Sequence, residues 1–237
     1  MKRSRRSVAD SSRETVLNGI RTALRRGPVS ESVRRELDGR LADHPASVVP
    51  SIARGGRDAL VARFIAQAEA SAATVARVAP DGVAAAVADL VRRHNLPARV
   101  AVAADPRLDD LDADGVLTVD RRGTPAPDDL VGVSHAVAGI AETGTLMMAS
   151  GPASPSTLNM LPDTHIVVVR ATDVAGGLED AWDRLRALST DGLPRTVHFI
   201  TGPSRTGDIE QTLQLGAHGP RRLHVILVDD GPDALGQ

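Results

Sequence analysis

Two short segments carry the side chains best suited to chemistry, and glycine lies in both. The first is Ala-Glu-Thr-Gly-Thr at 141–145, where Glu142 stands between apolar runs. Buried or half-buried glutamates usually have a partner or a function, and this one could serve as a base or nucleophile. Gly144 would let a substrate approach the backbone, while Thr143 and Thr145 would supply hydroxyl donors. A plain β-turn with an exposed glutamate is the alternative.

The second segment is Gly-Pro-Ser-Arg-Thr at 202–206, between a predicted strand and a predicted helix that begins near Thr206. Ligands of open α/β sheets bind where strands end, and the N-terminus of a helix attracts anions. Ser204 would add a hydroxyl donor, and Arg205 a planar fork that matches a carboxylate. The turn therefore predicts an anion site, although a simple capping turn with a solvated Arg205 remains open.

Five of the seven histidines lie between residues 135 and 224, and they fall into two groups. His218 lies in the loop Gly-Ala-His-Gly-Pro, which suits a residue that transfers protons or recognises an anion, with a helix C-terminal histidine as the alternative. His135, His165, His198 and His224 alternate with apolar neighbours, which favours structural roles. No histidine or carboxylate spacing is typical of a metal site.

A loop rich in proline and serine offers further polar groups. Ser154, Ser156 and Asn159 could contact a polar ligand, or they could belong to a short capped helix. The dinucleotide fingerprint, the P-loop and the zinc motif His-Glu-x-x-His are all missing from the sequence. A nucleophile elbow would require glycine where Thr206 stands, so Ser204 is expected to bind rather than to attack.

Composition narrows the class of protein. The chain of 237 residues has one Trp, two Phe, no Tyr and no Cys. Few aromatic residues are available for base stacking, and a net charge of −2 gives no basic field for nucleic acid. Without cysteine the chain forms no disulfide and ligates no iron–sulfur cluster through thiolates, so no intrinsic cofactor is expected. No apolar run has membrane-spanning length and none follows the basic start as in a secretory signal, which favours a cytoplasmic protein.

The elements that must position these residues alternate between short β-branched runs and helical patterns. Helices are predicted at 12–26, 57–78, 81–95, 178–189 and 206–216, and strands at 98–104, 115–119, 130–140, 143–149, 165–170, 196–201 and 223–229. Residues 27–56 have weak periodicity and are predicted to be an extended linker. We therefore expect an N-terminal appendage over 1–55 and an α/β domain over 56–237, an open Rossmann-like mixed sheet flanked by helices. A hairpin or meander is expected within this sheet, in the region 130–150.

Three stretches together resemble the LUD-domain family of lactate-utilisation protein C. They are "AGIAETGTLMM", "LNMLPDTHIVVV" and "ITGPSRTGDIEQTLQLGAHGPRRLHVILVDD", and the resemblance covers roughly residues 128–230. It implies a fold related to the sugar-phosphate isomerase and CoA-transferase superfamily. It also implies participation in the oxidation of L-lactate to pyruvate, beside two partner proteins that carry iron–sulfur clusters.

The resulting hypothesis is a non-redox subunit that binds a small carboxylate or another anion. The first alternative is a free-standing enzyme that uses Glu142 on a CoA ester, a sugar phosphate or a folate-like substrate. The second is an assembly module without an active site, which would be favoured if Glu142, Arg205 and His218 did not converge on one polar cleft. With Glu142 as the candidate catalytic residue, the predicted ligand-binding residues are Thr143, Gly144, Thr145, Gly202, Ser204, Arg205, Thr206, Asp208 and His218.

Overall fold

The computed structural model describes residues 4–25, 27–189, 192–206, 214–215 and 218–230, and the chain forms two compact units, Met1–Ser47 and Val48–Gln237. The smaller unit contains helices α1 (Ser4–Ala23) and α2 (Glu31–Asp43). Helix α1 confirms most of the helix predicted at 12–26. The prediction of an extended linker over 27–56 is wrong for residues 31–43, which form helix α2.

Helix α2 was missed because its apolar stripe is one residue wide. Val33, Leu37 and Leu41 repeat every four residues between charged neighbours, and all three are exposed. The ends of the helix carry clearer signals. The side chain of Ser30 accepts a hydrogen bond from the backbone N–H of Val33, and His44 ends the helix in the left-handed conformation at φ 43°.

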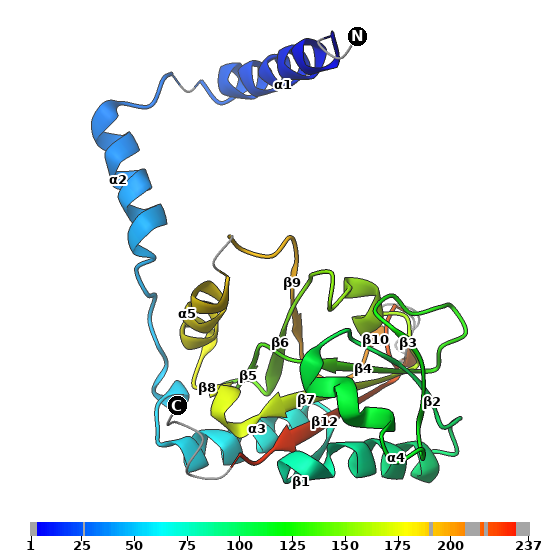
Figure 1. The fold of residues 1–237 in the computed structure, drawn as a ribbon. Coiled ribbons are helices and arrows are strands. Elements are labelled where there is room, and N and C mark those ends of the chain that lie inside the picture. The colour runs from blue at the N-terminus through cyan, green and yellow to red at the C-terminus, as the bar shows by residue number, and fades with distance from the viewer. Residues whose placement is uncertain (1–3, 26, 190–191, 207–213, 216–217, 231–237) are drawn as a thin grey trace. The chain divides into compact units, whose positions relative to one another are not determined.

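The centre of the larger unit is a six-stranded sheet in which all neighbouring strands run parallel, in the order β1-β12-β7-β4-β2-β3 (Figure 1). The two strands β7 and β12 are buried along almost their whole length, which explains their continuous apolar sequences. The strands are β1 (Thr74–Val78), β2 (Arg99–Val102), β3 (Thr118–Arg122), β4 (Val131–His135), β7 (Thr164–Arg170) and β12 (Arg222–Val228).

Helices and a second sheet cover the two faces of this sheet. Helix α4 (Val83–Arg93) and the 3₁₀ segment η3 (Pro106–Asp112) pack on one face through Val87, Leu90 and Leu108. Helix α3 (Arg57–Ala70) covers the other face with the fully buried Phe64, together with side chains of the second sheet. Four further 3₁₀ segments are η1 (Ser51–Ala53), η2 (Pro80–Gly82), η4 (Ser156–Asn159) and η5 (Ala171–Asp173).

The second sheet has four strands in the order β8-β5-β6-β9 and mixed pairing. They are β8 (Val174–Ala175), β5 (Ala138–Ile140), β6 (Thr145–Ala149) and β9 (Val197–Ile200), with helix α5 (Leu178–Leu188) against the outer face. The expected hairpin is therefore β5–β6, and it lies in this second sheet, whereas β4 belongs to the first. The predicted α/β class is confirmed, and the mixed pairing is found in the smaller sheet.

Three predicted boundaries are wrong. The strand predicted at 130–140 is divided, because the chain passes from one sheet to the other between β4 and β5. The helix predicted at 57–78 ends at Ala70, and Thr74–Val78 instead pairs with β12, where β-branched residues fit. The helix predicted from 206 is replaced at both of its ends by the antiparallel pair β10 (Arg205–Thr206) and β11 (Gln214–Leu215). The residues between these two strands lie outside the described part.

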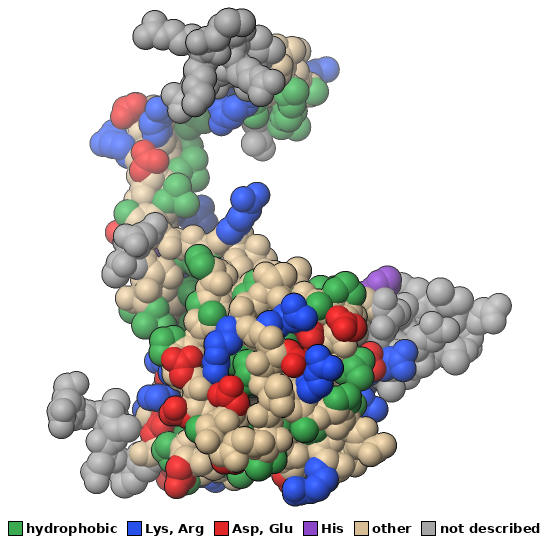
Figure 2. Space-filling view, turned by 45° about the vertical axis from the view of Figure 1, so that its right-hand side comes forward, with side chains coloured by type: hydrophobic (Ala, Val, Ile, Leu, Met, Phe, Trp, Pro, Cys, Tyr) green, Lys and Arg blue, Asp and Glu red, His purple; other side chains and the backbone are tan. Residues whose placement is uncertain are grey.

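Acidic and basic side chains are interspersed on the face of the larger unit that Figure 2 presents. None of the helices in the described ranges is long and apolar enough to cross a membrane.

Candidate functional site

A cavity of about 230 Å³ lies at the amino ends of β7 and β12, beside the turn that follows β9. Three predicted site residues, Gly202, Ser204 and His218, contribute to its wall. The lining consists of Asn159, Met160, His165, Phe199, Ile200, Thr201, Gly202, Pro203, Ser204, His218, Gly219, Pro220 and Leu223. The lining therefore combines apolar and polar side chains, which suits a small amphipathic ligand.

Backbone contacts fix the turn that forms one side of the cavity. Gly202 has φ +71°, and a Cβ at this position would collide with the backbone of Ser71 at the end of α3. The N–H of Ser204 donates to the carbonyl of Pro220 at 2.9 Å, which joins the turn after β9 to the loop before β12. Gly219 packs against the Cβ of Ser204, so this turn and the His218 loop are held together.

His165 is the most deeply buried titratable group of the cavity wall. Its Nε2 lies 2.6 Å from the hydroxyl of Ser134 in β4. Burial lowers the pKa of His165 to about 3, so the ring is neutral near pH 7. If the Ser134 hydroxyl donates to Nε2, Nδ1 carries the proton and becomes a donor, and Nδ1 has no partner among the described residues.

Asn159 gives the cavity a second buried polar group. It ends η4, only 2% of it is exposed, and its Oδ1 has no hydrogen-bond partner within the described ranges. Buried polar atoms are nearly always paired, so two unpaired ones on residues that line the same cavity favour a polar ligand there. The loop containing Asn159 was predicted as a possible polar contact, whereas His165 was expected only to be structural.

The Glu-Thr-Gly-Thr turn reaches the cavity through hydroxyl groups. The Oγ1 atoms of Thr143 and Thr145 are 2.6 Å apart, and that of Thr145 is 2.6 Å from Oγ1 of Thr201 in the cavity wall. Gly144 instead faces α3, where a Cβ would come within 2.7 Å of the Cα of Ala68. The observed role of Gly144 is thus close packing, and the structure shows no open space beside it for a substrate.

Of the remaining predicted residues, those that the structure describes do not line the cavity. Glu142 is half-buried and lies beside Gly177 at the start of α5, where its negative charge suits the helix dipole. Arg205 is exposed on β10, and Thr206 pairs with Gln214 across the two-stranded ladder. Asp208 lies outside the described residues. Glu142, Arg205 and His218 therefore do not converge on this cavity.

The comparisons with known proteins match the segment of the chain that contains the cavity residues. Residues 129–228 match the model of the LUD domain. Lactate utilization protein C of Exiguobacterium sp. is 35% identical over 102 residues, which cover 42% of this chain and 44% of that protein. The same-named protein of Bacillus subtilis is 30% identical over 150 residues, which cover 55% and 62%. An uncharacterized protein of Neisseria meningitidis is 40% identical over 97 residues, 41% of either chain.

The matched part of the chain spans less than two thirds of the length of these relatives. A crystal structure of a DUF162 family protein from Deinococcus radiodurans superposes with a TM-score of 0.55 at 21% identity. It covers 74% of this chain and 99% of that one, so the two share a fold.

The fold defines the class as an α/β protein, and residues 129–228, less than half of the chain, match the LUD domain. Within that class the chain is related in sequence to lactate utilization protein C. The resemblance carried by the three sequence stretches is thereby confirmed.

Proposed function

We propose that this protein takes part in lactate utilisation as a non-redox subunit that binds a small carboxylate in the cavity between β7, β12 and the Gly202 turn. The names of its relatives support the pathway. The observation that carries the binding role is the pair of unpartnered buried polar atoms, Oδ1 of Asn159 and Nδ1 of His165, in the cavity wall.

The wall matches the two ends of such a ligand. The hydroxyl of Ser204 and the exposed imidazole of His218 are donors for a carboxylate, and the amide of Asn159 and the ring of His165 can meet a neighbouring hydroxyl or carbonyl oxygen. Met160, Phe199 and Leu223 supply apolar surface for a methyl group. These groups would bind and orient the ligand, and the redox step is assigned to iron–sulfur partner proteins, as the resemblance to the family implies.

Binding in the cavity predicts a specific pattern of affinities. L-lactate and pyruvate should bind the full-length protein in isothermal titration, and Ser204→Ala or His218→Gln should each weaken binding roughly 10-fold or more. A lost hydrogen bond to a charged group costs about 1.5–3 kcal/mol, which corresponds to that factor. His94→Gln is the matched control, because His94 is an exposed histidine at the end of α4.

Equal affinities in Ser204→Ala, His218→Gln and the wild type would exclude this cavity as the carboxylate site. Loss of binding in the His94→Gln control would show that the effect is not local. Circular dichroism of each variant identifies any loss of fold.

Assembly with redox partners is tested by reconstitution. We expect lactate-dependent electron transfer by the iron–sulfur proteins of the same system to require this subunit, and deletion of its gene to abolish growth on L-lactate but not on glucose. Normal growth on L-lactate, in a strain without a second copy, would contradict the proposed pathway.

The assembly module remains the second candidate, because the separation of Glu142 and Arg205 from the cavity favours it over an enzyme that uses Glu142. The reconstituted system distinguishes the two. If His218→Gln and Ser204→Ala support full electron transfer, the subunit acts by assembly; if they reduce it while still joining the complex, the cavity is functional.

A further inference from the structure

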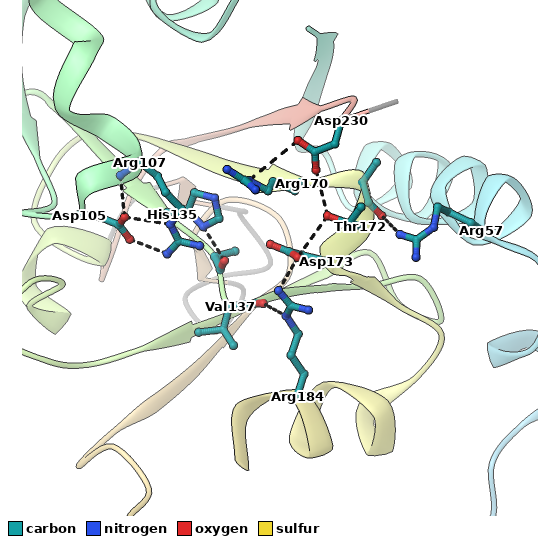
Figure 3. Close-up of polar contacts among 12 residues, drawn as sticks. Arg57, Asp105, Arg107, His135, Val137, Arg170, Thr172, Asp173, Arg184 and Asp230 are labelled. Atoms are coloured by element: carbon teal, nitrogen blue, oxygen red, sulfur yellow. Dashed lines mark hydrogen bonds and ion pairs between the residues drawn. The ribbon is translucent and has the colours of Figure 1, made fainter. Parts of the chain in front are cut away.

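A second polar cluster lies at the opposite edge of the six-stranded sheet, where β4 and β7 end. His135 is the last residue of β4 and Arg170 the last of β7, while Asp105 and Asp230 follow β2 and β12 (Figure 3). Strand β7 has seven residues, so about 20 Å separates this edge from the cavity at its other end. Carboxyl ends of parallel strands are the usual binding place in open α/β sheets.

Two residues of the cluster, Asp173 and Arg184, make contacts that hold parts of the fold together. Asp173 forms an ion pair with Arg184, whose Nε donates to the carbonyl of Val137 at 2.8 Å. These contacts tie η5 and α5 to the segment between β4 and β5. Burial raises the pKa of the Asp173 carboxyl, and the Arg184 charge opposes that rise. This pair is structural.

Arg170 has weaker polar contacts with the described residues than Arg184 has. Its side chain is 47% exposed, and its Nε lies 4.0 Å from Oδ1 of Asp230, beyond hydrogen-bond distance. The other carboxylate oxygen of Asp230 accepts from the hydroxyl of Thr172 at 2.9 Å. Among the residues that the structure describes, most donors of the Arg170 guanidinium are therefore available to a ligand at the centre of the sheet edge.

His135 supplies a hydrogen-bond acceptor beside this guanidinium. Its Nδ1 lies 2.7 Å from the carbonyl of Ala136, and because a carbonyl can only accept, Nδ1 carries the proton and Nε2 the lone pair. Burial, followed by the charge of Arg107, lowers the pKa of His135 to about 4, and Arg170 adds to the effect. Figure 3 shows the imidazole between the side chains of these two arginines.

Arg107 completes the arrangement. It is bound to the Asp105 carboxylate through Nε at 2.9 Å and Nη2 at 2.6 Å, which fixes its orientation while 43% of its side chain remains exposed. The edge thus presents two guanidinium groups, each beside a carboxylate (Asp105 and Asp230), with a neutral acceptor between them.

We propose that this edge binds the phosphate group of a small phosphate monoester, between Arg107 and Arg170 and above Nε2 of His135. A guanidinium can match phosphate oxygens bidentately, which Arg170 would do, whereas Arg107, whose Nε and Nη2 are bound to Asp105, would contribute its remaining Nη donors. A phosphate monoester with a second pKa near 6 still carries a proton in part of its population at neutral pH, and it can donate that proton in a hydrogen bond to Nε2. A carboxylate at the same pH is an acceptor only and would leave Nε2 unpaired, so phosphate fits better.

Titration of the full-length protein with inorganic phosphate and glycerol phosphate tests the site. We expect both to bind, Arg170→Gln to weaken binding at least 10-fold, and Arg170→Lys to restore part of the affinity because it keeps the charge. Sulfate, which has the same shape but no proton near neutral pH, should bind several-fold more weakly. Arg92→Gln on α4 removes the same charge from another exposed arginine and should leave affinity within 2-fold.

Proton NMR of His135 gives a second readout. Bound phosphate should raise the pKa of His135 from about 4, because it offsets the arginines that lower it; Asp105 is the acidic group that faces the ring in the free protein. Unchanged phosphate affinity in Arg170→Gln, or sulfate binding as tight as phosphate, would overturn the proposal. His218→Gln should leave phosphate binding intact, which separates this site from the cavity.

Discussion

Gly144→Ala is expected to destabilise the protein by roughly 3–5 kcal/mol, through a left-handed backbone that L residues avoid and through overpacking. Gly144 has φ +66°, and a new Cβ would overlap the backbone of α3 at Gln67 and Ala68. Backbone atoms of a packed helix cannot move aside as a flexible side chain can. Against a total stability of about 5–15 kcal/mol, the loss is large and should be visible in urea unfolding.

Gly115→Ala is the matched control for this substitution. Gly115 has a similar φ of +72°, but nothing lies within 4 Å of the position that its Cβ would occupy. It should therefore cost only the backbone part, about 1–2 kcal/mol. If both variants lost the same stability, the contact between the β5–β6 turn and α3 would not be the reason that glycine is required at 144.

The protein should lose stability steeply as the pH falls from about 6.5 to 4. Burial is the main cause that lowers the pKa of His135 and His224 to about 4 and that of His165 to about 3. The unfolded chain binds these protons near pH 6.5 and the folded chain does not. The free energy of unfolding is therefore highest above pH 6.5, and it falls below that pH as the unfolded state takes up protons. Each histidine should cost roughly 2 kcal/mol by pH 5, with stability read from urea unfolding at several pH values.

His224→Gln tests the origin of this dependence. His224 accepts or donates a hydrogen bond with Thr74 at 2.7 Å, which glutamine can keep while removing the titration. The slope of stability against pH should decrease by about a third, whereas His44→Asn at the exposed end of α2, where asparagine tolerates the left-handed backbone, should leave it unchanged. Equal slopes in wild type and His224→Gln would show that other groups govern acid unfolding. Asp173 opposes the trend, because burial raises its pKa above the ordinary 3.8 and the folded chain therefore binds this proton at a higher pH than the unfolded chain does.

The positions of most strands followed directly from the sequence. The runs at 166–169 and 225–228 are apolar throughout, and at this length that pattern favours a strand buried on both faces. The same reasoning could not separate β4 from β5, because a buried run reads alike whether it stays in one sheet or changes sheets. It also extended α3 into β1, since Val75 and Val78 fit a helical spacing as well as a strand.

The candidate site was predictable where its residues are close in sequence. Gly202, Ser204 and His218 belong to one segment, and the Ser204–Pro220 hydrogen bond joins its two parts. In the sequence, Asn159 is only one polar residue of a loop, and the apolar neighbours of His165 favour a structural role. Neither residue type shows from sequence whether its polar atoms find partners, because that depends on which strands lie beside it.

The α/β class, the resemblance to the LUD domain and the turn that borders the cavity depend on local patterns of residue type, so they could be predicted from the sequence. The packing of Gly144 on α3, the position of Glu142 beside α5 and the contact of His165 with Ser134 emerge only in the folded chain. Folding also gathers Arg107, His135 and Arg170 at one sheet edge from segments far apart in the chain. Such contacts are set by strand order and packing, which hydrophobic periodicity does not encode.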